Sequence, residues 1–121
     1  MKKLFIAFIL LCCHFLLHAQ TDFENIDALA RSMRKSQFDT PEALAKALCK
    51  DLKTDRDKAR AIFTWIADNV RYDFKSMDFV PPKGMSRAEL EAMRIERTYK
   101  KGKGVCEDYS VLYKHMAGAV G

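Results

Sequence analysis

The chain has 121 residues, of which 49% are hydrophobic and 31% are charged, and its formal net charge at pH 7 is +5. This composition is typical of a folded domain, and so small a positive excess does not argue for nucleic acid as a partner. The basic cluster from Lys100 to Lys103 is accordingly interpreted as a solvated turn rather than a polyanion site.

The first nineteen residues have the pattern of a secretory signal peptide. Lys2 and Lys3 form a short basic region, Leu4–Leu17 is a nearly unbroken apolar run, and Ala19 ends a loose cleavage site before Gln20. This order of basic, apolar and small residues is that of a cleaved signal. A transmembrane anchor is the alternative, but the apolar run is shorter than the roughly 20 residues that span a bilayer.

A lipoprotein signal is a second alternative, because Cys12 and Cys13 lie within the apolar run. Leu11, which precedes them, is bulkier than a lipidation site usually accepts. We therefore predict cleavage after Ala19, a secreted or periplasmic protein, and no stable membrane anchor after cleavage. Loss of the two signal lysines lowers the net charge from +5 to +3.

Apolar residues at helical spacing predict three helices in the first half of the mature chain. The first runs from Thr21 to about Lys35. The second is capped by Thr40 with proline at its first position, and it ends near residue 52 or 53. The third is capped by Asp55 and runs from about residue 56 to 70. Its expected buried stripe is Ala59, Ile62, Phe63, Ile66 and Val70, with Trp65 close to it.

The second half begins with a short extended segment over 71–74 and a proline-rich loop over 81–84. Ser86 and Glu89 form a capping box that opens a further helix, which ends near residue 96 or 99. A basic, glycine-containing turn over 100–104 leads to a final helix. The inward stripe expected there is Cys106, Tyr109, Tyr113, Met116 and Val120, widened by Leu112 and Ala117. No alternating strand pattern is visible, so the sequence predicts a predominantly α-helical chain.

Cys106 is the residue with the clearest chemical potential. It follows Gly104 and a basic turn, and it stands at the start of the predicted final helix. The N-terminus of a helix has unpaired N–H groups and a partial positive charge, and both stabilise a thiolate. Glu107 and Asp108 are interpreted as acids of the first turn that complement the helix dipole.

The second mature cysteine leaves two interpretations open. In an oxidising compartment a disulfide between Cys49 and Cys106 is the simplest expectation. Cys49 lies in an apolar helical stripe, however, where cysteine behaves as a small buried hydrophobic residue. The different surroundings favour separate roles for the two cysteines over one bond.

A nucleophilic cysteine needs a histidine within hydrogen-bond reach and a third group to orient it. His14 and His18 belong to the predicted signal, and His115 follows Cys106 by nine residues on the same helix. That spacing places His115 about 13.5 Å along the axis and on roughly the opposite side. We therefore interpret His115 as a solvent-facing or packing residue. Two scattered cysteines and one histidine also predict no metal site, and no glycine motif predicts a phosphate-containing cofactor.

Two segments together resemble the transglutaminase-like superfamily. The first is Asp57–Asp73, with Trp65 at its centre and an Asn-Val-Arg-Tyr-Asp exit. The second is Lys103–Gly121, in which Gly-Val-Cys is followed by acidic residues, an aromatic residue, a small residue and an apolar helix. The resemblance covers residues 55–121 and implies that they are the N-terminal part of a transglutaminase-like domain. The chain is thus divided into the predicted signal peptide (1–19), an N-terminal helical segment (20–54) and this domain part (55–121).

The resemblance implies an α+β fold in which the cysteine-bearing helix packs on a sheet. It implies that Cys106 is a nucleophile that attacks an amide of a protein or peptide to form a thioester, with its backbone N–H as oxyanion donor. The histidine and aspartate of the family triad lie downstream on strands. We therefore expect the chain to be a fragment of a longer secreted protein, inactive alone and only marginally stable, with Tyr109, Tyr113, Met116 and Val120 exposed.

Two other classes of function remain open from the sequence. One is a secreted, non-catalytic binding module that retains the scaffold without the triad. The other is a small helical secreted protein closed by a disulfide between Cys49 and Cys106. The sequence does not decide between hydrolysis and acyl transfer, and it does not indicate an oligomeric state.

Overall fold

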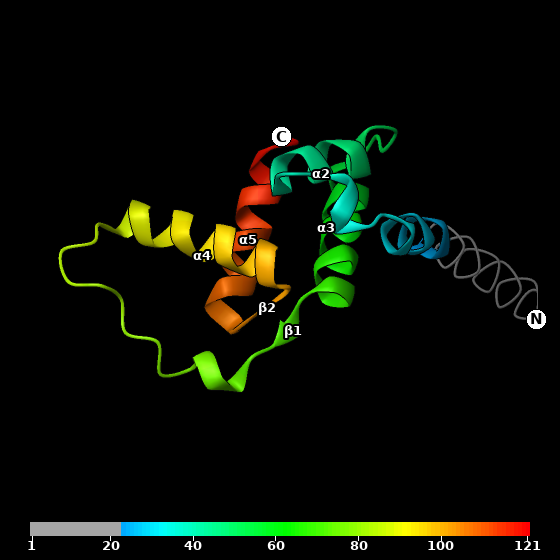
Figure 1. Ribbon diagram of the computed structural model, residues 1–121. Coiled ribbons are helices and arrows are strands. Elements are labelled where there is room, and N and C mark those ends of the chain that lie inside the picture. The colour runs from blue at the N-terminus through cyan, green and yellow to red at the C-terminus, as the bar shows by residue number, and fades with distance from the viewer. Residues whose placement is uncertain (1–22) are drawn as a thin grey trace, which may run out of the picture.

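The computed structural model describes residues 23–121, and this part of the chain is predominantly helical, as the sequence predicts (Figure 1). The predicted signal peptide lies outside the described residues. The first described helix spans residues 23–32. The elements that follow, in chain order, are the 3-10 turn η1 (Lys35–Gln37), α2 (Pro41–Cys49), α3 (Asp55–Asn69), β1 (Arg71–Tyr72), the 3-10 turn η2 (Phe74–Ser76), α4 (Arg87–Lys101), β2 (Lys103–Gly104) and α5 (Cys106–Gly118). None of the helices in residues 23–121 is long and apolar enough to cross a membrane.

The last helix, α5, lies at the centre of the arrangement. It packs against α2, α3 and α4, and Figure 1 shows it between α3 and α4. The core that these helices share is closed by apolar side chains from every one of them. The largest of its fully buried apolar members are Trp65, Leu44, Leu48, Ile62, Leu112 and Met116. The helix that begins at Cys106 is therefore fixed along its length by three others.

A two-stranded parallel pair joins the end of α3 to the beginning of α5. Arg71 is paired with Lys103, and Tyr72 with Gly104. The N–H of Arg71 donates to the carbonyl of Gly102 at 2.9 Å. The extended segment expected over 71–74 is thus confirmed at its first two residues. The turn expected over 100–104 is confirmed only at Gly102, because residues 100 and 101 still belong to α4 and residues 103 and 104 extend to pair with β1.

The predicted cap of α3 is wrong by one residue. Thr54, rather than Asp55, adopts the extended cap conformation, and its hydroxyl accepts from the N–H of Asp57 at 3.1 Å. Asp55 lies in the first turn instead, where a negative charge complements the helix dipole. The predicted cap of α2 by Thr40 and the capping box of Ser86 and Glu89 are both confirmed.

The predicted buried stripe of α3 is also partly wrong. Phe63 is 58% exposed, whereas Trp65 is only 1% exposed and lies in the core. The indole N–H of Trp65 donates to the carbonyl of Met33 at 3.0 Å. The helix is therefore rotated about its axis so that Ala61, Ile62 and Trp65 face the neighbouring helices. The sequence did not reveal this rotation, because the spacing of Ile62 and Ile66 fits a buried face that includes either Phe63 or Trp65.

The predicted inward stripe of α5 is wrong at Cys106, which is exposed, and is confirmed at Met116, which is completely buried. The separate expectation that the chain, taken as a fragment, leaves Tyr109, Tyr113, Met116 and Val120 exposed is wrong, because α2, α3 and α4 cover this side of the helix. The line that faces the interior is Asp108, Leu112 and Met116. Tyr109 and Tyr113 are half-buried beside that line. Cys106 lies at the surface because the buried face of α5 includes Asp108, and residues two positions apart on a helix point to different sides.

Three helices end at other residues than predicted. The first described helix ends at residue 32 rather than near 35, and the second ends at Cys49, three residues early. The helix α4, by contrast, continues to Lys101. Gly102 ends α4 in the left-handed conformation with φ +62°, and its N–H donates to the carbonyl of Thr98. Glycine adopts this conformation without the steric penalty that a Cβ brings.

Replacing Gly102 by alanine is therefore expected to destabilise the chain by about 1–2 kcal/mol, the usual cost of a left-handed residue that has a Cβ. The added Cβ would also lie 3.1 Å from the carbonyl oxygen of Asn69. Urea unfolding of the two proteins measures the difference. Gly118→Ala is the matched control, because an added Cβ there meets nothing within 4 Å. Equal stability of Gly102→Ala and wild type would contradict this account of the turn.

An ion pair fastens the first described helix to α3. The Asp27 carboxylate accepts from Arg60 Nε at 2.8 Å and Nη2 at 2.7 Å, and from the Thr64 hydroxyl at 2.8 Å. The hydrogen bond from Arg60, followed by that from Thr64, lowers the pKa of Asp27 to about 2 against the opposing effect of burial. Residues 23–32 are thus held to the same core as the cysteine helix.

Candidate functional site

The candidate site is the beginning of α5, where Cys106 is the first helical residue. Val105 precedes it in an extended conformation, with φ −101° and ψ 178°, directly after β2. The parallel pair and the helix therefore meet at the cysteine. Its side chain is an exposed free thiol, which a nucleophile that must reach a substrate requires.

The backbone at the same position can serve an oxyanion. Cys106, Glu107 and Asp108 are the first residues of α5, and a helix offers no acceptor for the N–H groups of its first turn. A negatively charged oxygen placed beside the thiol would accept from such groups and benefit from the helix dipole. The arrangement is chemically suited to stabilising the charge that develops when a thiolate attacks an amide carbonyl.

The turn before the cysteine is shaped by the side chain of Asp108. Its Oδ2 atom accepts from the backbone N–H of Val105 at 2.9 Å. Gly104 leaves the space that this side chain fills, since a Cβ there would lie 2.6 Å from the Cβ of Asp108 and 2.9 Å from its Oδ2. Glycine at position 104 is thus required by close packing, which explains the glycine two residues before the cysteine.

Asp108 is also the anion of a buried charge cluster with α4. Its side chain is fully buried and accepts from Arg94 Nη1 at 2.8 Å and from Arg97 Nη2 at 3.3 Å. The ring of Phe79 covers both guanidinium groups, with its centre 5.4 Å from the Arg94 Cζ and 4.6 Å from the Arg97 Cζ. Asp108 is thus an acid of the first turn, as the sequence predicts, but it is buried and paired with α4, which the sequence does not reveal.

Glu107 is also an acid of the first turn, as the sequence predicts. Its side chain is 59% exposed, and its carboxylate accepts from Arg94 Nη2 at 2.9 Å. Within residues 23–121, the Glu107 side chain makes no hydrogen bond to the backbone of residues 104–106. The two neighbouring carboxylates thus differ, because one lies on the surface and the other lies inside the turn that ends at Cys106.

An open apolar groove runs beside the cysteine helix. It has a volume of about 550 Å³ and lies between α3 and α5, and the residues that line it are Phe63, Ile66, Ala67, Tyr109, Ser110 and Tyr113. The hydroxyl of Ser110 donates to the carbonyl of Cys106 at 2.9 Å, so the groove begins one helical turn from the cysteine. The hydroxyl of Tyr109 donates to the carbonyl of Val70, and burial of the phenol raises the pKa of Tyr109.

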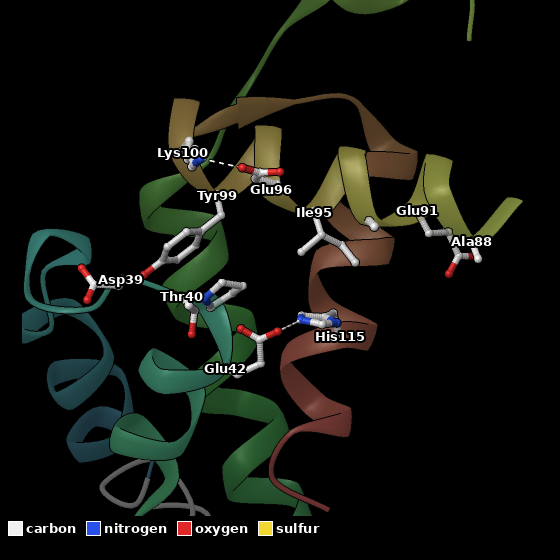
Figure 2. A pocket seen from close by; sticks show the side chains of 12 residues that line it. Asp39, Thr40, Glu42, Ala88, Glu91, Ile95, Glu96, Tyr99, Lys100 and His115 are labelled. Carbon is white, nitrogen blue, oxygen red and sulfur yellow. Dashed lines mark hydrogen bonds and ion pairs between the residues drawn. The ribbon is translucent and has the colours of Figure 1, made fainter. Parts of the chain in front are cut away.

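His115 lies near the other end of α5 and contacts Glu42 of α2 rather than Cys106 (Figure 2). Its side chain is 34% exposed. His115 is thus partly exposed and packs against α2 through this contact, in agreement with its interpretation as a solvent-facing or packing residue. The backbone N–H of Glu42 and then the His115 ring hold the pKa of that carboxyl below its usual value, against the effect of burial. The expectation that His115 does not pair with Cys106 agrees with this geometry.

The two described cysteines are separate thiols, so the structure does not support the disulfide interpretation. Cys49 is buried in α2, and its Sγ lies 4.0 Å from the carbonyl oxygen of Lys58. Burial raises the pKa of the Cys49 thiol. A buried thiol of this kind is chemically inert, whereas Cys106 is accessible.

Sequence reasoning identified the cysteine but missed the residues that surround its turn. Arg94 and Arg97 are three positions apart on α4, and this spacing places them on one helix face. A pair of arginines on one face is a usable signal of a carboxylate partner. The sequence does not reveal that the partner is Asp108, because the pairing depends on how α4 and α5 pack.

Comparison with known proteins supports the family that the two segments resemble. The family model of the transglutaminase-like superfamily matches residues 42–121, so the match includes α2 as well as the cysteine helix. No curated protein and no solved structure matches the chain significantly. The family match extends over most of the chain, from the first helical turns of α2 to the end of the cysteine helix. The chain therefore belongs to the transglutaminase-like superfamily.

Proposed function

We propose that this chain is the N-terminal part of a secreted thiol enzyme that cleaves or transfers amides of proteins or peptides through a thioester on Cys106. Secretion is proposed from the signal-like residues 1–19, with cleavage after Ala19. The reaction has two parts, of which the first forms the thioester and releases an amine or ammonia. The second transfers the acyl group to water or to an amine.

The observation that supports the proposal best is the position of Cys106. It is an exposed free thiol at the first position of a thirteen-residue helix, directly after an extended residue. The N–H groups of the first turn are available for an oxyanion, and the helix dipole favours both thiolate and oxyanion. The same atoms thus assist the formation of the nucleophile and the stabilisation of the charge that its attack creates.

The apolar groove between α3 and α5 supports a peptide as substrate. Its walls are aromatic and aliphatic side chains together with the hydroxyl-bearing Ser110, and it begins one turn from the cysteine. Apolar and aromatic surface next to a few placed polar groups is typical of ligand sites. We propose that the groove accepts an apolar side chain of the substrate, close to the amide that is attacked.

The catalytic histidine and aspartate are proposed to come from sequence that follows residue 121, as does the sheet of the α+β family fold. Within residues 23–121 the single histidine contacts Glu42 at the far end of α5. Without a general acid, no group protonates the amine that leaves when the thioester forms. We therefore propose that the thirteen-residue helix is one part of a site that a downstream segment completes.

The alternative function is a secreted binding module without catalysis. Reading the gene beyond residue 121 separates the two at low cost. A histidine followed by an aspartate or asparagine in predicted strands supports the enzyme, and their absence supports the module.

The proposed function is tested by incubating the full-length protein with glutamine-containing peptides, with and without a primary amine. Release of ammonia at a rate above that of buffer is expected, because the thioester forms in either case. Incorporation of the amine distinguishes transfer from hydrolysis. A full-length protein that contains the histidine and aspartate yet releases no ammonia and hydrolyses no peptide bond would contradict the proposal.

A further inference from the structure

We infer that Asp108 is a positioning residue for the Cys106 nucleophile, an inference that rests on the proposed function of that cysteine. Asp108 does not touch the reacting atoms. It fixes the turn from Gly104 to Cys106, and through this turn it sets where the thiol and the backbone N–H of Cys106 lie.

Asp108 binds the backbone directly before the nucleophile, since its Oδ2 atom accepts from the Val105 N–H at 2.9 Å. Val105 is the residue that caps α5, and its own side chain has no acceptor. The carboxylate three positions later therefore provides the side-chain hydrogen bond that orders the entry of the helix. Loss of that bond leaves the residue before the nucleophile free to move relative to the first turn.

The Asp108 side chain also packs directly against Gly104. The space beside the Gly104 Cα is so narrow that no Cβ fits. A Cβ added to Gly104 would lie 2.6 Å from the Asp108 Cβ and 2.9 Å from its Oδ2. The strand residue, the carboxylate and the cap thus form one packed unit. A displacement of the carboxylate moves the backbone on both sides of Val105.

The Asp108 carboxylate is itself held in place by two arginines of α4. Arg94 donates to Oδ1 at 2.8 Å, Arg97 contacts both carboxylate oxygens at 3.3 Å, and the side chain of Asp108 is 0% exposed. Phe79 covers the two guanidinium groups from the loop between η2 and α4. A buried ion pair alone is weak support for a role in stability. Here its geometry fixes a third group, the Val105 N–H, next to the nucleophile.

Four variants of the full-length protein test the inference, with kcat and KM measured for amide turnover. Asp108→Ala is expected to lower kcat by about 100-fold with KM little changed, since misplacement of a reacting group by about 1 Å costs that much. Asp108→Asn keeps an oxygen that can accept from Val105, so it is expected to recover most of the loss. Gly104→Ala displaces the carboxylate without removing its charge and is expected to resemble Asp108→Ala.

Glu107→Gln is the matched control. The substitution removes a carboxylate that is adjacent to the cysteine and that, like Asp108, pairs with Arg94. Within residues 23–121 this carboxylate makes no hydrogen bond to the backbone of residues 104–106. Its kcat is expected to stay within about 2-fold of wild type, because the Asp108 bond to the turn is unchanged. If the negative charge alone mattered, Glu107→Gln and Asp108→Asn would change kcat alike, and the pH profile of turnover would shift. A positioning role lowers the plateau of that profile and leaves its shape unchanged.

Hydrogen exchange of the Val105 amide, followed in the same proteins, separates failure of this inference from failure of the proposed function. The amide is expected to exchange at least about 10-fold more slowly in wild type than in Asp108→Ala, because its acceptor is removed in the variant. Absence of turnover in wild type contradicts the proposed function. Wild-type kcat in folded Asp108→Ala, or in folded Gly104→Ala if Asp108→Ala does not fold, overturns the inference. Equal exchange of the Val105 amide in wild type and in folded Asp108→Ala overturns it without reference to turnover.

Discussion

Replacing Cys106 by alanine is expected to lower kcat for amide turnover in the full-length protein by about 10⁴-fold or more. Loss of a nucleophile leaves only the catalysis that binding and oxyanion donors provide. The thiol is exposed and lies outside the buried core, so its removal is expected to leave the fold intact. Steady-state ammonia release measures the activity, and circular dichroism with urea unfolding measures the fold.

The matched control for this variant is Cys49→Ala. Cys49 is a free thiol like Cys106, but it is buried in α2. Its replacement is expected to leave kcat unchanged and to lower the free energy of unfolding by about 1 kcal/mol, as loss of a small buried group does. Retained turnover in Cys106→Ala would remove the proposed nucleophile, and loss of turnover in folded Cys49→Ala would assign the essential thiol to the wrong helix.

Replacing Trp65 by alanine is expected to lower the free energy of unfolding by about 3–5 kcal/mol, the usual cost of truncating a buried aromatic residue. Trp65 is 1% exposed, and its ring centre lies 6.0 Å from that of Tyr99. The variant also leaves the Met33 carbonyl without the indole donor that binds it at 3.0 Å. A small domain has only about 5–15 kcal/mol in total, so the change is a large fraction of its stability.

Phe63→Ala is the matched control, because Phe63 is an aromatic residue of the same helix but is 58% exposed. Its replacement is expected to change the free energy of unfolding by less than about 1 kcal/mol, since a mostly exposed ring contributes little burial. Urea unfolding of both variants gives the comparison. A larger loss in Phe63→Ala than in Trp65→Ala would favour the helix rotation that periodicity predicted over the one in the structure.

Local signals in the sequence predicted the beginnings of helices well. Thr40 with Pro41, and Ser86 with Glu89, specify helix starts through bonds between residues that are close in the chain. Capping depends on these neighbours alone. The same kind of signal misplaced one cap, because a threonine and an aspartate stand next to each other at positions 54 and 55 and either residue type can cap.

Features that depend on tertiary contacts were not predictable in the same way. The positions of Ile62 and Ile66 fit a buried face that includes either Phe63 or Trp65, and only the packing of neighbouring helices decides between them. Glu107 and Asp108 likewise look equivalent in sequence. Their difference arises because Asp108 faces α4, where Arg94 and Arg97 form ion pairs with its carboxylate.

The central claim is that Cys106 forms the covalent intermediate, and mass spectrometry of the acid-quenched full-length protein tests it most directly. Cleavage after Lys103 and Lys114 gives a peptide over 104–114 in which Cys106 is the single cysteine. During turnover this peptide is expected to gain the mass of the substrate acyl group, and hydroxylamine is expected to remove it, as it cleaves thioesters. An active protein that bears the acyl group on another residue, or that turns over with no acyl group on this peptide, would contradict the account.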